Sequence, residues 1–240
     1  MIAKEGVTIL AQFFKKYKHG LIIVSYAVLY TLLFALLERR SVPAYHVVHT
    51  VFDDYIPFCE YFIVPYLLWF PYMFLAVAYF IFRNPDRREY YQLTWNLIMG
   101  MTIFLIVSYI YPNGHHLRPL SFARDNIFVD AVKRLYLTDT PTNILPSIHV
   151  FNSLAIHMAI TSCRSLKNHR LVRASSLILT VLIILSTMFL KQHSFVDVSM
   201  GATLALAGYL IFYREKQSSY EREYQRERLR RRRRKKNTVI

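Results

Sequence analysis

The sequence predicts an all-α, polytopic membrane protein built as a bundle of six transmembrane helices. Two observations carry this prediction. First, hydrophobic residues make up 54% of the 240 residues, and they gather in runs of about 20 residues with very little charge, the length that a helix needs to cross a bilayer. Second, Lys and Arg are concentrated in alternate connections between these runs, as in chains that cross a membrane repeatedly.

Six apolar runs follow one another along the chain. They are Leu21 to Leu37, Pro57 to Phe82, Gln92 to Ile110, Leu145 to Cys163, Ala174 to Leu190 and Phe195 to Tyr213. We interpret the first run as a retained helix rather than a signal peptide, because it lacks a small-residue cleavage site and charged residues follow it directly. We expect one membrane domain, residues 1–213, followed by a basic tail, residues 214–240.

The distribution of positive charge predicts the orientation. The connections on the side of the N-terminus contain 23 Lys and Arg residues, and those on the other side contain 7. Positive residues near span ends stay in the cytoplasm, so both termini are expected there. The connection 111–144 and the short turn at His193 are then expected on the extracytoplasmic face. The compact loops favour the cell (cytoplasmic) membrane of a bacterium as the location.

The formal net charge of +15 is placed unevenly. Residues 214–240 contain 12 Lys and Arg against 4 Glu, and they include the run Arg230 to Lys236. A basic segment beside a membrane span attracts anionic lipid, at about 1 kcal/mol for each basic residue near the surface. We expect this partner rather than nucleic acid, because no aromatic stacking platform accompanies the charge.

Three polar segments fall at one expected depth on the extracytoplasmic side. His115 to Pro119 follows the third span, Pro146 to His149 opens the fourth, and Lys191 to Asp197 opens the sixth. A histidine nucleophile, a second histidine as the acid and cations for the phosphoryl oxygens are the groups that phosphoryl transfer requires. The convergence of these residue types therefore predicts a site for that chemistry.

His193 and Asp197 are four residues apart, so they share one face of a helix. A carboxylate bonded to one ring nitrogen fixes the tautomer and leaves the other nitrogen free as a base or nucleophile. An Asp inside an apolar run costs about 2.5 to 3.5 kcal/mol, so a partner or a task is expected for it. The alternative is that Asp197 only caps its helix or pairs with Lys191. His149, taken alone, is equally consistent with an interfacial residue that makes one hydrogen bond.

In this order the three segments resemble the motifs of the type 2 phosphatidate phosphatase superfamily, the lipid phosphatases and phosphotransferases related to vanadium haloperoxidases. The family pattern is Lys, six residues, Arg-Pro; then Pro-Ser-Gly-His; then Ser-Arg, five residues, His, three residues, Asp. The matching residues, all between the third and the sixth span, are Arg118, Pro119, Pro146, Ser147, His149, Ser186, His193 and Asp197. Tyr111 and Thr187 stand where the family has two phosphate-binding cations, and Ile148 stands where it has glycine.

The resemblance implies a mechanism that needs neither a metal ion nor another cofactor. His193 attacks phosphorus to form a phosphohistidine, and Asp197 orients the ring and stabilises its charge. His149 protonates the leaving oxygen and then activates the water or alcohol that cleaves the intermediate. Arg118 and Ser147 bind phosphoryl oxygens.

The two missing cations need substitutes in this scheme. Lys191 is a candidate for one because it is close to His193 in the sequence. His115 and His116 are candidates for the other.

Hydrolysis of a lipid phosphate or pyrophosphate is the function that we expect, with phosphatidate, phosphatidylglycerol phosphate and polyprenyl pyrophosphate as candidate substrates. Two alternatives stay open. Fungal inositol phosphorylceramide synthases carry a bulky apolar residue at the position of Ile148, and sphingomyelin synthases lack the arginine that Thr187 replaces, so head-group transfer between lipids is one. A catalytically inactive lipid-binding or scaffold protein is the other.

Overall fold

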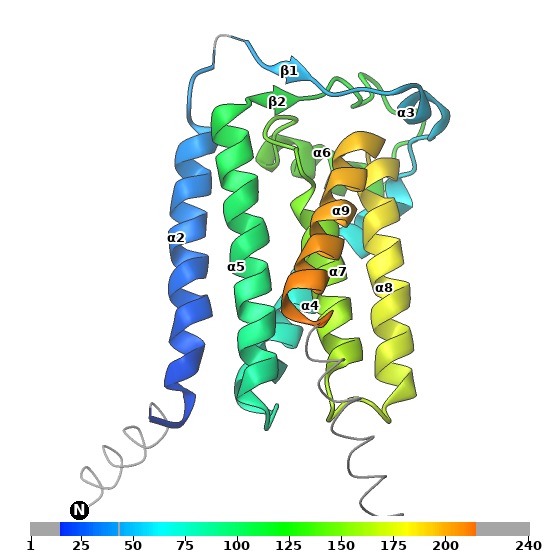
Figure 1. The fold of residues 1–240 in the computed structure, drawn as a ribbon. Coiled ribbons are helices and arrows are strands. Elements are labelled where there is room, and N and C mark those ends of the chain that lie inside the picture. Colours follow the sequence, from blue (N-terminus) through cyan, green and yellow to red (C-terminus); the bar gives the residue numbers. More distant parts are fainter. Residues whose placement is uncertain (1–14, 43, 215–240) are drawn as a thin grey trace, which may run out of the picture.

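The structure is a computed structural model that describes residues 15–42 and 44–214 (Figure 1). Long helices lie side by side, and the short elements after residue 40 gather at one end of them. The long helices are α2 (Leu21–Glu38), α4 (Ile63–Phe82), α5 (Arg87–Ile110), α7 (Ile148–Ser162), α8 (Arg170–Phe189) and α9 (Phe195–Phe212). The short elements are the 3-10 helices η1 (Lys18–Gly20) and η2 (Glu60–Phe62), the helices α3 (Val51–Tyr55) and α6 (Ile127–Thr138), and the strands β1 (His46–Val47) and β2 (Asn113–Gly114).

Five helical segments are long and apolar enough to cross a membrane, which confirms the prediction of a helical membrane protein at that level. They are Lys15–Glu38, Glu60–Phe82, Arg87–Ile110, Arg170–Phe189 and Phe195–Phe212. The predicted fourth span corresponds to α7, which has 15 residues. At a rise of 1.5 Å per residue it is about 22 Å long, shorter than the hydrocarbon core of about 30 Å. The count of six spans therefore stays a prediction, and residues 215–240 of the predicted tail lie outside the described residues.

Helix α7 is the centre of the bundle. It packs against α4, α5, α8 and α9, and its side chains Val150, Ala155 and Ile156 are fully buried. Helix α2, by contrast, lies at the edge and packs mainly against α5. The residues at the start of α7 are therefore surrounded by protein, whereas the side of α2 that points away from α5 faces outward.

The chain that leads into α7 is fixed by Asn113. Its side-chain oxygen accepts hydrogen bonds from the backbone N–H groups of Ile144 (2.9 Å) and Leu145 (3.0 Å), and its carbonyl accepts one from the N–H of Asn143 (2.7 Å). Strand β2, which contains Asn113, pairs in parallel with β1. The start of α7 is thereby tied to the segment that follows α2.

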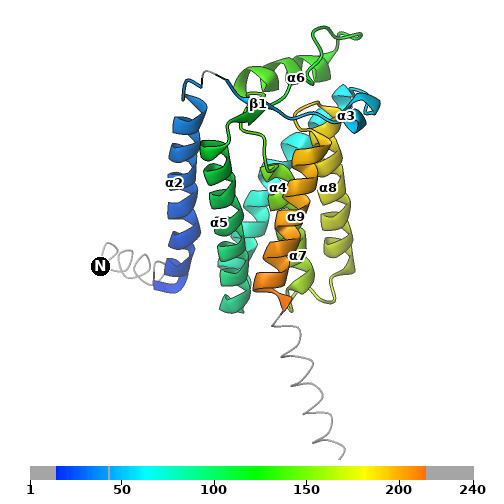
Figure 2. The ribbon, with the colours of Figure 1, turned by 45° about the horizontal axis from the view of Figure 1, so that its top comes forward.

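Helix α6 lies within the connection 111–144, across the end of the bundle (Figure 2). The side chain of Asn126 caps it by accepting from the N–H groups of Phe128 and Val129 (3.0 Å each). The same side chain donates to the buried carboxylate of Glu60 (3.1 Å), so the start of α6 is joined to the start of α4. We call the end of the bundle that carries α6 the α6 end.

Candidate active site

All three polar segments singled out in the sequence lie at the α6 end (Figures 1 and 2). His149 is in the first turn of α7, and His193 is in the turn between α8 and α9. Although 44 positions separate them, His149 Nδ1 lies 3.3 Å from His193 Nε2. Both histidines are buried, with exposed fractions of 9% for His149 and 7% for His193. The structure thus brings the two histidines into direct contact.

Asp197 determines which nitrogen of His193 is free. Its Oδ2 lies 2.5 Å from His193 Nδ1, and the residue is completely buried in the first turn of α9. An ionised carboxylate only accepts hydrogen bonds, so Nδ1 carries the hydrogen and Nε2 keeps its lone pair. That lone pair faces His149, which places Asp197, His193 and His149 in one row.

The ring of His149 is held between two aromatic side chains of α4. Its centroid lies 4.7 Å from that of Tyr66 and 4.5 Å from that of Trp69. These contacts fix the plane of the imidazole, because both neighbours are large and Tyr66 is itself almost fully buried. Proton transfer needs a donor held at a defined angle, and this packing provides it.

The two histidines meet because α7 and α9 approach closely at Gly201. The backbone N–H of Ser147 donates to the carbonyl of Asp197 (2.9 Å). A Cβ atom added at Gly201 would lie only 2.6 Å from the carbonyl oxygen of Ser147. A side chain at this position would therefore push the two helices apart.

We accordingly expect Gly201→Ala to destabilise the protein by about 1 to 3 kcal/mol. Any catalysis that depends on the two histidines should fall by up to about 100-fold, since misplacing catalytic groups by about 1 Å has effects of that size. Thermal unfolding in detergent and an activity assay measure the two changes. Gly208→Ala is the control, because Gly208 lies two turns along the same helix, where a Cβ atom would meet the Asn96 side chain. For an equal drop in unfolding temperature, Gly208→Ala should reduce activity less than Gly201→Ala does.

Arg118 belongs to a network beside the histidine pair. Its guanidinium donates to the side chain of Gln192 (2.5 Å) and to the carbonyls of Tyr136 (3.0 Å) and Asp139 (2.5 Å). The amide of Gln192 donates in turn to the carboxylate of Asp139 (3.1 Å), which also accepts from the hydroxyl of Tyr66 (2.6 Å). Burial lowers the pKa of Arg118 despite the neighbouring Asp139. The structure places Arg118 behind Gln192. Both terminal nitrogens of its guanidinium make hydrogen bonds, and its buried Nε has no partner among the described residues.

Ser147 caps a helix, and Thr187 accepts backbone hydrogen bonds. Ser147 is fully buried and is the N-cap of α7, where its hydroxyl accepts from the N–H of Val150 (3.5 Å). The carbonyl of Thr187 accepts from the N–H groups of Gln192 (2.9 Å) and His193 (3.1 Å). Thr187, which stands where the resemblance described above leads us to expect an arginine, therefore shapes the turn that carries His193.

His115 supports this turn from the other side. Its Nε2 lies 2.9 Å from the carbonyl of Gln192, and its Nδ1 accepts from the N–H of Leu117 (3.1 Å). Burial lowers the pKa of His115 to about 4, although the hydrogen bond to the Gln192 carbonyl opposes the shift. The ring is neutral at physiological pH and does not replace a missing cation. His116 is exposed and lies 3.5 Å from the hydroxyl of Tyr45.

Lys191 does not join the two histidines. Its ammonium donates to the backbone carbonyl of Asp53 (2.7 Å), and it lines a second, smaller pocket of about 340 Å³ with Asp53, Asp54 and His116. Burial lowers the pKa of Lys191, and the nearby carboxylates oppose that shift. Lys191 and His193 are two positions apart in the sequence and line different pockets.

Asp53 is a residue whose role the sequence did not reveal. Its carboxylate accepts from the hydroxyl of Ser194 (2.6 Å) and from the backbone N–H groups of Phe195 (2.7 Å) and Thr50 (2.8 Å). Burial by itself would raise the pKa of Asp53, but these hydrogen bonds together hold it below its ordinary value. Asp53 therefore fixes the start of α9, directly after His193.

Asp53→Ala should destabilise the protein at pH 7 by about 1 to 3 kcal/mol, because it leaves the donors of Ser194 and Phe195 buried without their acceptor. Since the folded-state pKa is lowered, the ionised carboxylate stabilises the fold above the unfolded pKa of about 3.9 and loses that effect as the pH falls through the folded value. The unfolding temperatures of the parent and the variant should converge in acid. Asp54→Ala, at an exposed carboxylate paired with His49, should show a small difference at any pH.

Both histidines line a cavity of about 860 Å³ at the α6 end. Its polar part contains the histidines, Gln192 and residues of the segment from Asp139 to Asn143. Its apolar part reaches between α2 and α4. The residues of that part include Tyr30, Phe34, Leu67, Phe70, Phe104 and Ile148. A molecule with a polar head and a hydrocarbon chain matches this division.

Within residues 15–42 and 44–214, the structure shows no cluster of three or more His, Cys, Asp and Glu side chains that could hold a metal ion. Comparison with known proteins identifies no relative: no protein-family model, no curated protein and no solved structure matches this chain. The functional assignment therefore rests on the site itself.

Proposed function

We propose that this protein is a membrane lipid phosphatase that hydrolyses a phosphate or pyrophosphate ester of a lipid at the extracytoplasmic face. One observation carries the proposal: Asp197, His193 and His149 form a row, and the two imidazoles line a cavity with an apolar extension. An oriented imidazole lone pair next to a second imidazole is the arrangement that nucleophilic catalysis with acid assistance requires.

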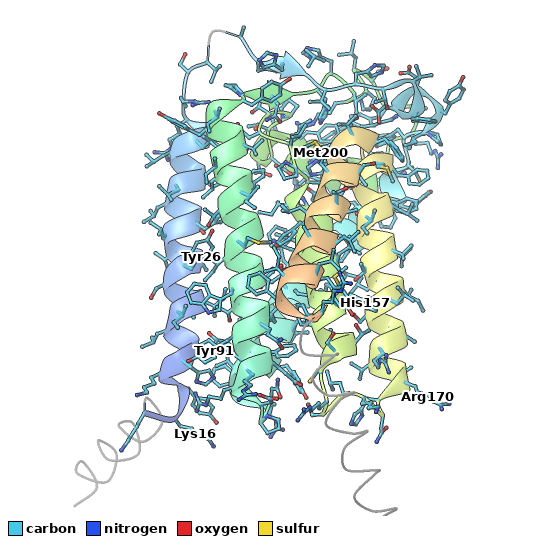
Figure 3. All side chains as sticks on the ribbon, in the orientation of Figure 1. Lys16, Tyr26, Tyr91, His157, Arg170 and Met200 are labelled. Carbon is cyan, nitrogen blue, oxygen red and sulfur yellow. The ribbon has the colours of Figure 1, made fainter. Side chains whose placement is uncertain are left out.

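The proposal includes the placement in the membrane. Helix α7, the fourth along the chain, brings the number of membrane segments to six, and the α6 end faces away from the cytoplasm. Lys16 and Arg170 lie at the opposite end of the bundle (Figure 3), in keeping with the retention of positive residues in the cytoplasm. Both termini are then cytoplasmic, and the basic tail lies against anionic lipid of the cell membrane.

In the first chemical step, the Nε2 lone pair of His193 attacks phosphorus. A nitrogen–phosphorus bond forms while the bond from phosphorus to the leaving oxygen breaks, and protonated His149 gives its proton to that oxygen. Asp197 stabilises the positive charge that develops on the His193 ring. The phosphoryl group has to separate the two histidine nitrogens, which are in contact in this structure.

In the second step, His149 is neutral and takes a proton from a water molecule. The water oxygen bonds to phosphorus, the nitrogen–phosphorus bond breaks, and phosphate leaves. His193 returns to its starting form with the hydrogen on Nδ1, and His149 is protonated for the next turnover. The chain supplies the nucleophile, the proton donor and the base from its own side chains.

Head-group transfer is the second candidate, and the shortage of cations at the site favours it. The terminal nitrogens of Arg118 donate to Gln192 and to two backbone carbonyls, Arg118 is not among the described residues that line the cavity, and Lys191 is in another pocket. A phosphodiester carries one negative charge fewer than a fully ionised phosphomonoester, so it needs less compensation. In that case a lipid alcohol, rather than water, would cleave the phosphohistidine.

The test is an assay of purified protein against phosphatidate, phosphatidylglycerol phosphate and a polyprenyl pyrophosphate, with inorganic phosphate as the readout. A parallel reaction contains a phospholipid with a labelled head group and an acceptor lipid that carries a free hydroxyl. We expect phosphate release from at least one substrate. Transfer of label without phosphate release would replace hydrolysis by head-group transfer. Neither reaction, together with retained lipid binding, would point to a catalytically inactive lipid-binding or scaffold protein.

A further inference from the structure

One face of α6 forms part of the wall of the 860 Å³ cavity. Two adjacent rows of residues, each with a spacing of about one helical turn, make up this face. The apolar row is Ile127, Ala131 and Leu135, and the polar row is Asp130, Arg134 and Thr138. A lipid in the cavity would meet the apolar row with its chain region and the polar row with its head group.

Arg134 is the only Arg or Lys among the described residues that line this cavity. The acidic side chains there already have partners. Asp130 lies 3.3 Å from the ammonium of Lys133, and Asp139 accepts from Tyr66 and Gln192. The guanidinium of Arg134 makes no hydrogen bond or ion pair with the part of the chain that the structure describes. Arg134 is therefore an exposed positive charge in the wall of the cavity, with no ion-pair partner among the described residues.

The position of Arg134 relative to the histidines is fixed by two anchors of α6. The hydroxyl of Tyr136 donates to the carbonyl of Leu190 (2.6 Å), three residues before His193. Asp139, at the end of α6, contacts Gln192, the residue that directly precedes His193. Arg134 is five residues before Asp139, about 7 to 8 Å along the helix axis. It is therefore close to the site but beyond reach of the contacts that hold the histidine pair.

We propose that Arg134 binds a second phosphate group of the substrate, one that lies next to the reacting phosphorus and is not itself attacked. This inference rests on the proposed function and makes lipids with two phosphates its preferred substrates, with phosphatidate as a poorer one. A guanidinium recognises phosphate oxygens with two parallel hydrogen bonds. The second phosphate belongs either to a pyrophosphate or to a phosphodiester farther along the head group, as in phosphatidylglycerol phosphate.

The experiment compares Arg134→Ala with Lys133→Ala, which removes the same charge from the adjacent position of the same helix. Lys133 pairs with Asp125 and Asp130 and does not contribute to the cavity wall among the residues that the structure describes. Kinetics are measured on phosphatidate, phosphatidylglycerol phosphate and a polyprenyl pyrophosphate. We expect Arg134→Ala to raise the KM for a two-phosphate substrate by at least about tenfold, equivalent to about 1.4 kcal/mol. Its kcat, and its KM for phosphatidate, should change less than about twofold.

Further comparisons identify the source of the second phosphate or overturn the role proposed for Arg134. Whichever of the two substrates shows the larger KM increase identifies the source of the second phosphate. Arg134→Lys should recover part of the affinity, because it restores the charge without the forked donors. Equal losses on phosphatidate and on the two-phosphate lipids would overturn the proposal, and so would equal effects of Lys133→Ala and Arg134→Ala.

A binding measurement separates this inference from the proposed function. The chain has two tryptophans, and Trp69 contacts His149 and lines the cavity. In a Trp95→Phe background, the fluorescence of Trp69 reports titration with short-chain phosphatidylglycerol phosphate in detergent. Binding that depends on Arg134 in a protein that releases no phosphate would refute the phosphatase and retain the subsite. Phosphate release that is the same in Arg134→Ala as in the parent would instead retain the phosphatase and refute the subsite.

Discussion

His193→Ala is expected to lower phosphate release by about four orders of magnitude or more, as removal of a catalytic nucleophile does in other enzymes. The reason is that His193 Nε2 is the atom with an oriented lone pair, held by the contact of Nδ1 with Asp197 (2.5 Å). A methyl group cannot form the covalent intermediate. Binding of lipid should persist, because the cavity wall otherwise stays intact.

The intermediate itself provides the sharper readout. Parent protein mixed with lipid labelled in the reacting phosphate, and stopped within one turnover, should carry label that is stable in base and lost in acid, as phosphohistidine is. His193→Ala should carry none. His116→Ala, at an exposed histidine of the α6 end, should behave like the parent. If His193→Ala still acquired label, the nucleophile would have to be another residue.

His149→Ala is expected to lower turnover of a lipid phosphate by about 10² to 10⁴-fold, the usual contribution of a general acid and base. The two steps should respond differently to the leaving group. An alkoxide needs a proton as it leaves, whereas a nitrophenolate does not. With a nitrophenyl phosphate as substrate, the first step in His149→Ala should approach the rate in the parent, and the second step should stay slow because it needs a base.

The measurement is a rapid-mixing experiment that follows nitrophenol. We expect His149→Ala to release a burst of about one equivalent and then to turn over slowly. His157→Ala is the matched control: His157 lies deeper in the bundle, away from the α6 end (Figure 3), and its Nδ1 contacts the hydroxyl of Ser176 (2.9 Å). It should give no such burst. A uniform loss in His149→Ala with both leaving groups would mean that the residue only positions the substrate.

The five long apolar helices could be predicted from the sequence because hydrophobicity along a helix is a local property. The predicted run 195–213 and the helix Phe195–Phe212 nearly coincide. Helix α6 was not predicted, since charged residues such as Asp130 and Arg134 interrupt the apolar pattern that marks a span. A signal for it was nevertheless present: Asn126 is a favourable N-cap, and Phe128, Val132 and Tyr136 recur at helical spacing.

The site could be predicted in part for the same reason. His193 and Asp197 are one helical turn apart, so their contact follows from local geometry. The environment of Lys191 does not, because a turn directs neighbouring side chains to different sides, and here it sends Lys191 toward Asp53. The contacts of Tyr66 and Asp139 join segments 73 positions apart, and only the packing of α4 against α6 brings them together. Long-range pairs of this kind leave no periodic trace in one sequence.

The shortness of α7 has a consequence for how water reaches a site in a lipid phase. Because four other helices enclose α7, its length does not have to match the thickness of the bilayer, and the cost of such a mismatch falls on helices that lipid touches. The core helix can therefore begin below the level of the head groups without thinning the membrane around it. In the proposed mechanism the lipid oxygen leaves phosphorus on the side away from His193, and water then has to arrive from that same side. A cavity sunk within the protein would have to admit the solvent molecule along the route by which the lipid departs.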